Sequence, residues 1–293
     1  MQAVTANYKL IKKIKDDRFD EEFLNQYSLL IQTGPKDFQL AVIDSRDRRL
    51  LVLEDYAMGN VQSHAELLEA LKELFDAHAL LKAGFWKEVK IVAKTNKFCQ
   101  VPEELFLEAK ADEYLKLNVS AGDVKEKVLF CKNKSNSVIT VFAVQEDLYQ
   151  WLCGIYQNTS YQFFHQSTAL IEGVLRTKDT SQNILYIYVD RFKLHILSAS
   201  QGKLIYYNQF PIKQFPDYVK YIMLALKGLD MDQQKSEIVL WGYIGKNSPH
   251  YQEFIKYIRN VTFGARPSHL KFGYLFDEVQ EHHFFDLYSL HLL

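Results

Sequence analysis

Short runs of apolar residues, rich in β-branched and aromatic side chains, recur in the first part of the chain. They cover residues 27–33, 38–44 and 49–56, and short polar turns separate them. Runs of this length and composition predict β-strands, and their close spacing predicts an antiparallel meander. The pattern then changes to a helical period over 63–82 and returns to a strand pattern over 88–93.

The same order recurs in the second half. Three strands are predicted at 184–189, 192–198 and 203–210, a helix at 215–228 and a strand at 237–241. Apolar residues run almost all the way round the helix, which predicts that it is deeply buried.

The passage between the two series, at about 95–158, is predicted to be an insertion. It contains two strands, at 126–132 and 137–144, followed by a helix at 145–158. Residues 161–175 then read as a strand that continues directly into a helix.

Two meanders, each followed by a helix and another strand, predict a duplicated α/β domain in which antiparallel strands give way to parallel ones. This order is typical of the actin-like superfold shared by actin, sugar kinases and heat-shock chaperones. The fold class expected is therefore an actin-like ATPase (ribonuclease H-like) fold, with duplicated mixed-sheet domains and helices on both faces. The first lobe is expected to span 1–165 and the second 166–293.

The whole chain also resembles a bacterial family of unknown function to which an actin-like ATPase fold is assigned. The matching stretches are "FDEEFLNQYSLLIQTGPKDFQLAVID" (19–44), "VPEELF" (101–106) and "HHFFDLYSL" (282–290). The central passage is similar in layout to actin-like proteins that recruit division or pilus machinery to the membrane. The resemblance implies the fold and brings no agreed activity with it.

Charge and composition exclude several classes of partner. The chain has 35 basic and 36 acidic residues, so no overall field favours nucleic acid. A lysine-rich run near the start is offset by acids and predicts a solvated face. No apolar stretch approaches the roughly eighteen residues of a membrane-spanning helix, and the start lacks the apolar core of a secretory signal. Three scattered cysteines, without a CxxC pair, suggest reduced thiols and a cytoplasmic location. These cysteines are Cys99, Cys131 and Cys153.

An actin-like ATPase needs a first hairpin that brings a carboxylate to Mg²⁺ and main-chain N–H groups to phosphate. Here Gly34 and Lys36 are candidate nucleotide-binding residues, because glycine permits close approach and lysine can meet a phosphate. Gln32, however, stands where an acid is expected and cannot balance a divalent ion. Asp37 lies beyond the turn and is expected in solvent. An ordinary hairpin turn is the favoured interpretation of the stretch.

The second hairpin should be rich in glycine, because side chains would keep main-chain amides from the β- and γ-phosphates. It has the two-residue turn Asp190-Arg191 and no glycine. Asp190 could mimic the acidic member of the motif and Arg191 could meet an anion. This turn is the largest departure from an ATPase pattern.

The stretch "IVLWGYIGKNSPHYQEF" (238–254) should hold a glycine pair against adenine and ribose. Gly242 is present, but Tyr243 takes the place of the second glycine, and Gly245 follows later. Ser248 is predicted to cap a helix that could bind an anion through its first N–H groups. A strand-turn-helix scaffold without ligand is the other interpretation.

No catalytic residue and no metal ligand is assigned. Glu172 is a candidate for a base that orients water towards a γ-phosphate, but an exposed helical charge explains it equally. The tail carries His282, His283 and Asp286, but adjacent histidines point different ways on a helix and no second cluster adds ligands. The apolar tail residues are expected to dock on their own domain or on a partner.

The function predicted is a non-catalytic scaffold or protein-interaction module with degenerate nucleotide motifs and a protein partner. It would use the interlobe cleft, the 95–158 region or the C-terminal tail. The alternative is an ATP-binding switch or weak ATPase, with ATP and Mg²⁺ as cofactors bound at Gly34, Lys36, Asp190, Gly242 and Gly245. A sugar-kinase-like phosphotransferase would need an acidic base that the sequence does not show.

Overall fold

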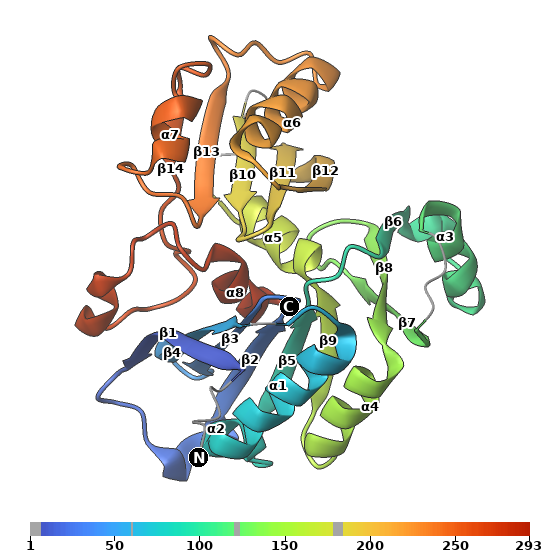
Figure 1. Cartoon of the computed structure of the whole chain (residues 1–293), viewed down its shortest axis with the longest axis vertical. Helices are drawn as coiled ribbons and strands as arrows, with labels where there is room; N and C mark the ends of the chain where they lie inside the picture. Colours follow the sequence, from blue (N-terminus) through green and yellow to red (C-terminus); the bar gives the residue numbers. More distant parts are fainter. Residues whose placement is uncertain (1–6, 60, 120–123, 178–183) are drawn as a thin grey trace. The chain divides into compact units, whose positions relative to one another are not determined.

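The computed structural model describes residues 7–59, 61–119, 124–177 and 184–293, and of Phe215 only the backbone. The chain divides into two compact units, each with its own sheet (Figure 1). The first unit comprises Met1–Lys132, Ser137–Ala169 and Ser268–Asp277. The second comprises Asn133–Asn136, Leu170–Pro267 and Glu278–Leu293.

The first unit contains a mixed six-stranded sheet in the order β1-β4-β3-β2-β5-β9. Strands β1 to β4 pair antiparallel, whereas β2, β5 and β9 are parallel. The bounds are β1 Tyr8–Lys15, β2 Tyr27–Thr33, β3 Asp37–Asp44, β4 Arg49–Met58, β5 Glu88–Ala93 and β9 Tyr161–His165. Every residue of β2 and β3 is buried, which explains their nearly continuous apolar sequence.

Helices cover this sheet because each has one apolar stripe. In α1 (His64–Ala77), the Ser63 hydroxyl accepts from the Glu66 N–H and the Glu66 carboxylate accepts from the Ser63 N–H, forming a capping box. The centroid of the Phe75 ring of α1 lies 4.7 Å from the centroid of the Trp151 ring of α4 (Glu146–Ile155), so the two helices lie side by side. The remaining short helices are α2 (Ala79–Lys82) and the 3-10 helix η1 (Glu21–Gln26).

The predicted insertion forms a small three-stranded sheet in the order β6-β8-β7, all antiparallel. Helix α3 packs on this sheet around Leu115, Val101 and Val141. The bounds are β6 Phe98–Pro102, β7 Glu126–Lys132, β8 Val138–Gln145, α3 Ala111–Asn118, and the 3-10 helices η2 Glu103–Leu105 and η3 Glu108–Lys110.

The second unit repeats the plan of the first in a five-stranded sheet ordered β12-β11-β10-β13-β14. Strands β10, β11 and β12 are antiparallel, and β10, β13 and β14 are parallel. The bounds are β10 Ile184–Val189, β11 Lys193–Ser200, β12 Lys203–Pro211, β13 Glu237–Gly242 and β14 Val261–Phe263. The predicted duplication, with antiparallel strands giving way to parallel ones, is therefore present.

Alternate residues of β10 point to opposite faces of this sheet. Leu185, Ile187 and Val189 pack with α6 (Phe215–Gly228) and α7 (Pro249–Phe254). Tyr186 and Tyr188 face α5 (Gln166–Leu175) and α8 (Phe285–Ser289). Helices thus cover both faces.

The C-terminal tail packs into its own unit. All residues of α8 are buried, and the Tyr188 hydroxyl donates to Asp286 Oδ1 at 2.5 Å. A Cβ on Gly173 would lie 2.2 Å from Ser289 Oγ, so this glycine lets α5 approach the tail closely. The 3-10 helices η4 (Tyr274–Glu278) and η5 (Leu290–Leu292) complete the chain's regular elements among the described residues.

The lysine-rich start is solvated as predicted, because Lys9, Lys13 and Lys15 are exposed, but it forms an edge strand, β1, that the sequence did not predict and that pairs with β4. One local prediction is wrong. Helix α6 is not deeply buried, because Lys220, Leu224 and Lys227 are exposed. Within the described residues, no helix is long and apolar enough to cross a membrane.

Candidate functional site

The first predicted hairpin lies at the carboxyl end of β2. The Gly34 N–H donates to the Asp37 carbonyl at 2.9 Å, which closes the turn. A Cβ at Gly34 would lie 2.4 Å from Asp37 Oδ1, so this position requires glycine for a contact within its own hairpin. The Lys36 ammonium donates to the Val61 carbonyl.

Asp37 is buried, in contrast to the solvent position expected from its place beyond the turn. Its Oδ2 lies 2.6 Å from the Nζ of Lys94, and the two side chains are 6% and 2% exposed. Lys94 also donates to Gln39 Oε1 at 3.3 Å, and the Gln39 amide donates to Asp55 at 3.2 Å. Gln32, which replaces the expected acid, pairs with Gln39 across β2 and β3 and is fully buried. A buried polar row therefore crosses the sheet here.

The second hairpin has its tip one residue later than predicted. Asp190 N–H donates to the Lys193 carbonyl at 2.9 Å, which leaves Arg191 and Phe192 at the tip. Asp190 is buried and its Oδ1 accepts from the Arg191 N–H at 2.8 Å. The Arg191 guanidinium lies over the Tyr243 ring, 4.7 Å from its centroid. Cation–π contact of this kind holds the arginine against its own unit.

Gly242 is held by the neighbouring strand. Its φ of +93° is a backbone conformation that favours glycine, and a Cβ there would lie 2.1 Å from the Val189 carbonyl oxygen. The next residue, Tyr243, donates its N–H to that same oxygen at 2.7 Å. The glycine that the sequence suggested for adenosine contact thus serves close packing of β13 on β10.

The residues after Gly242 form the predicted turn and helix start. The Gly245 carbonyl accepts from the Ser248 N–H at 2.9 Å, and a Cβ at Gly245 would meet nothing closer than 3.8 Å. Ser248 caps α7 by accepting the Tyr251 N–H at 3.1 Å. The structure therefore brings Asp190, Arg191 and Gly242 together in the second unit, and Gly34 and Lys36 together in the first.

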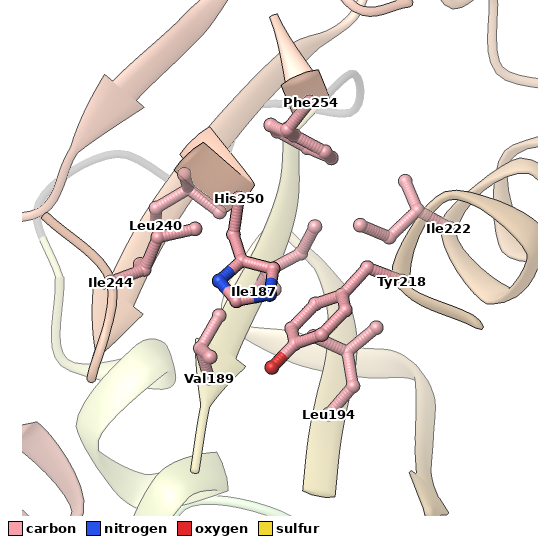
Figure 2. A pocket seen from close by; sticks show the side chains of 9 residues that line it. All are labelled: Ile187, Val189, Leu194, Tyr218, Ile222, Leu240, Ile244, His250 and Phe254. Atoms are coloured by element: carbon pink, nitrogen blue, oxygen red, sulfur yellow. The ribbon is translucent and has the colours of Figure 1, made fainter. Parts of the chain in front are cut away.

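A small cavity lies in the second unit, bounded by β10, β11, β13, α6 and α7 (Figure 2). Its volume is about 10 Å³, close to the minimum for one water molecule, so it cannot hold a purine. Figure 2 shows the His250 imidazole beside the Tyr218 ring, with centroids 5.8 Å apart, among aliphatic side chains such as Ile244.

Glu172 is fully buried, so its interpretation as an exposed helical charge is wrong. Its two carboxylate oxygens accept from the backbone N–H of Ser135 at 2.7 Å and from the Ser135 hydroxyl at 2.6 Å. The side chain holds the turn at Asn133–Asn136 onto α5 within the second unit.

The tail histidines and the cysteines also have structural contacts. His282 Nε2 lies 2.6 Å from the Ile244 carbonyl, and burial lowers the pKa of this imidazole. Burial raises the pKa of the Cys131 thiol to about 11 and also raises that of Cys99, so neither is a ready thiolate. Among the residues described, no three His, Cys, Asp or Glu side chains are grouped as metal ligands.

Sequence reasoning missed the side chains that follow β5. Lys94, Thr95, Asn96 and Lys97 line a cavity of about 260 Å³ together with the turn after β2. The position of these residues directly after a predicted strand could have indicated the site, because α/β proteins bind ligands at loops that follow the carboxyl ends of adjacent parallel strands.

Comparisons with known proteins agree with this architecture. The model of a family described as "Protein of unknown function (DUF3822)" matches residues 16–261. No curated protein is similar enough in sequence to count as a relative of this chain.

Two solved structures share the fold. A Bacteroides thetaiotaomicron VPI-5482 protein with an actin-like ATPase fold and unknown function is 22% identical, with a TM-score of 0.78. The match covers 94% of this chain and 99% of that one. A chain of the PilM-PilN type IV pilus biogenesis complex is 11% identical, with a TM-score of 0.62, covering 90% and 97%. The chain therefore has the actin-like ATPase fold.

Proposed function

Because the chain belongs to the DUF3822 family of proteins of unknown function and has the actin-like ATPase fold, we propose that it is a non-catalytic scaffold that binds another protein. The proposal keeps the expected lobes, 1–165 and 166–293, and the expected cytoplasmic location.

The packing around Gly242 is the observation that carries the proposal. A ligand that lies against main chain needs bare backbone, and glycine usually supplies it. Here Val189 occupies the space that the missing side chain leaves, and Tyr243 with Arg191 covers the neighbouring hairpin tip. The groups that would approach a nucleotide are used in contacts within the unit.

The first hairpin supports the same conclusion. Lys36 donates to the Val61 carbonyl, and Asp37 forms a buried ion pair with Lys94. Releasing Asp37 to a hydrated Mg²⁺ would leave the Lys94 ammonium buried without its anion, which is costly. Releasing Lys36 to a phosphate would remove its hydrogen bond to the Val61 carbonyl.

The insertion offers an apolar surface for a partner. Leu105, Leu107 and Leu117 are 67%, 63% and 83% exposed. The Tyr114 hydroxyl donates to the Leu105 carbonyl and accepts from the Leu107 N–H, so both leucines lie beside α3, the helix that also carries Leu117. Five acidic residues lie in the same segment, at 103, 104, 108, 112 and 113. Glu103 pairs with Lys132 and Glu113 with Lys110, and the other three favour a partner segment that is apolar and basic. The similar PilM chain is itself solved in a complex with PilN.

A nucleotide-binding experiment tests the first half of the proposal. Isothermal titration calorimetry of the purified protein with Mg-ATP, Mg-ADP and Mg-GTP is expected to give no binding heat. Micromolar affinity for Mg-ATP that Asp190→Ala abolishes would overturn the proposal and favour the ATP-binding switch.

A paired capture experiment tests the second half. The wild type is expected to retain a host protein from a lysate, and Leu105→Asp/Leu107→Asp/Leu117→Asp to lose it. The control Leu224→Asp changes an equally exposed leucine of α6 and should retain it. The captured protein is then purified and its dissociation constant measured for all three forms. If the captured protein binds the triple variant as tightly as the wild type, this leucine surface is not its binding site.

A further inference from the structure

A cavity of about 260 Å³ lies within the first unit, at the carboxyl ends of β2 and β5. The two strands are parallel neighbours whose last paired residues are Thr33 and Ala93. The turn after β2 contributes Gly34 and Pro35, and the loop after β5 contributes residues 94–97.

This position is a topological switch point of the sheet. After β2 the chain turns to β3 on one side, and after β5 it leads through the insertion and α4 to β9 on the other. The two connections leave in opposite directions, and the cavity lies between the strand ends. Open α/β sheets bind their ligands in such crevices.

The walls of the cavity are mostly apolar. Pro35 comes from the first turn, Leu67 from α1, Val144 from β8 and Leu148 from α4. Pockets for drug-sized ligands have volumes of roughly 300–1,000 Å³, so this cavity suits a smaller metabolite. A ligand with a small apolar side chain fits this cavity.

One lysine and one glutamate in the wall form an ion pair. Lys97 Nζ lies 2.8 Å from Glu126 Oε1, and their side chains are 28% and 19% exposed. Lys94 in the same wall is committed to the buried pair with Asp37. The wall therefore offers one accessible cation and one accessible anion, with no net charge between them.

A hydroxyl in the wall adds a second, independent observation. Thr33 is 6% exposed, and its Oγ1 has no hydrogen-bond partner among the described residues. Buried polar atoms are nearly always hydrogen-bonded, so Thr33 adds to the lining residues a hydroxyl whose hydrogen bond the described residues do not supply.

We propose that this cavity binds a small zwitterion with the chemistry of an apolar α-amino acid. A ligand carrying only a carboxylate would take Lys97 and leave Glu126 largely buried without its cation. A ligand carrying only an ammonium would do the reverse. Both outcomes cost free energy, because a buried charge that loses its partner keeps its desolvation penalty. A zwitterion pairs with both charges and places its apolar side chain against Leu67 and Leu148. The site is independent of the proposed scaffold function.

Calorimetry with matched ligands tests the head group. L-leucine, L-methionine and L-phenylalanine are titrated into the full chain, and the two analogues of leucine are 4-methylpentanoate and 3-methylbutylamine. At least one amino acid is expected to bind saturably, and both analogues to bind at least about tenfold more weakly, because sites built for polar groups reject ligands that lack them. No binding by any of the three amino acids, or equal binding of an analogue, would overturn the proposal.

Variants test the location. Lys97→Met and Glu126→Gln are each expected to weaken the binding amino acid at least about tenfold, since each leaves one ligand charge unpaired. Lys132→Met removes the lysine of a more exposed pair with Glu103, outside the cavity, and should leave the affinity for the amino acid unchanged. Leu67→Trp, which fills the cavity, should abolish binding while the melting temperature stays measurable. Binding that survives both Lys97→Met and Leu67→Trp would place the ligand elsewhere and overturn the assignment.

Discussion

The ammonium group of Lys94 lies 2.6 Å from the carboxylate of Asp37, and both side chains are buried. The two residues are neighbours because β5 ends beside the hairpin that joins β2 to β3. The pair lies beside the strand end at which the ATPase pattern calls for a magnesium-orienting acid and at which this chain has Gln32, since Lys94 also donates to Gln39, the cross-strand neighbour of Gln32.

Replacing Lys94 alone should therefore be costly. Lys94→Met leaves the Asp37 carboxylate buried without a cation, and breaking a buried pair in this way costs about 3–5 kcal/mol. Urea unfolding at pH 7 measures the change in unfolding free energy.

The double variant Asp37→Asn/Lys94→Met provides the control. It removes both charges together, so it should be more stable than Lys94→Met. Lys110→Met, in an exposed pair with Glu113, should leave the stability unchanged. The unfolding free energies of Asp37→Asn and Lys94→Met are also measured singly. If the double variant loses as much unfolding free energy as the two single variants together, the two side chains do not act as a pair.

A second prediction concerns pH. Burial by itself would raise the pKa of Glu54, but hydrogen bonds from His78, Tyr56 and Lys13 outweigh it and lower the pKa to about 2. The Glu54 carboxylate lies 2.8 Å from His78 Nε2 and 2.9 Å from Lys13 Nζ. Because this pKa is lower in the folded protein than in the unfolded chain, the stabilisation is complete above roughly pH 5 and disappears as the pH falls towards 2.

The shift corresponds to a stabilisation on the order of 3 kcal/mol at neutral pH. Unfolding free energies of the wild type and Glu54→Gln are measured between pH 2 and 7. The difference between the two proteins should shrink steadily below pH 5, because glutamine does not titrate. A difference that is constant with pH would contradict the prediction.

The sequence predicts the interior strands well and the contacts between distant residues poorly. Strand β2 was predicted at its observed bounds, because a strand buried on both faces is apolar throughout. Strand β1 was missed, since an edge strand exposed on one side carries lysines that mask its alternation. Asp37 was expected in solvent, and an exposed helical charge was one of the two interpretations of Glu172, although each is buried.

The reason is that burial of a charge depends on its partner. Asp37 meets Lys94, which lies 57 positions away in the chain, and Glu172 meets Ser135, 37 positions away. Neither partner can be identified without the fold. The cavity at the ends of β2 and β5 required the same knowledge, because its wall combines two loops, two helices and strands β7 and β8 of the insertion.

A third prediction concerns Gly242. Gly242→Ala places a methyl group 2.1 Å from the Val189 carbonyl oxygen at a φ of +93°, so strand β13 must move away from β10. We expect a loss of about 2–4 kcal/mol in unfolding free energy, from backbone strain and lost packing.

Gly228→Ala is the matched control. This residue ends α6, and a Cβ there would meet no atom within 4 Å. Alanine is the better helix former, so the change should be neutral or stabilising by up to about 1 kcal/mol. Equal destabilisation by the two variants would show that the contact with Val189 has no special cost.

The last prediction concerns the C-terminal tail, which is fastened by the hydrogen bond from the Tyr188 hydroxyl to Asp286. Both groups are fully buried, and burial together with the Asp286 charge raises the pKa of Tyr188 well above its ordinary value, so the phenol stays a donor at all physiological pH. Tyr188→Phe removes the donor and leaves Asp286 with less stabilisation, which should cost about 1–3 kcal/mol. Because the tail packs against α5, the amide protons of 285–293 should also exchange faster with solvent, as hydrogen exchange with mass spectrometry can measure.

Tyr274→Phe is the control. It removes an exposed hydroxyl that donates to Asp17, and it should change neither the unfolding free energy nor the exchange in the tail. Unaltered exchange in the tail of Tyr188→Phe would mean that its apolar residues alone hold it in place.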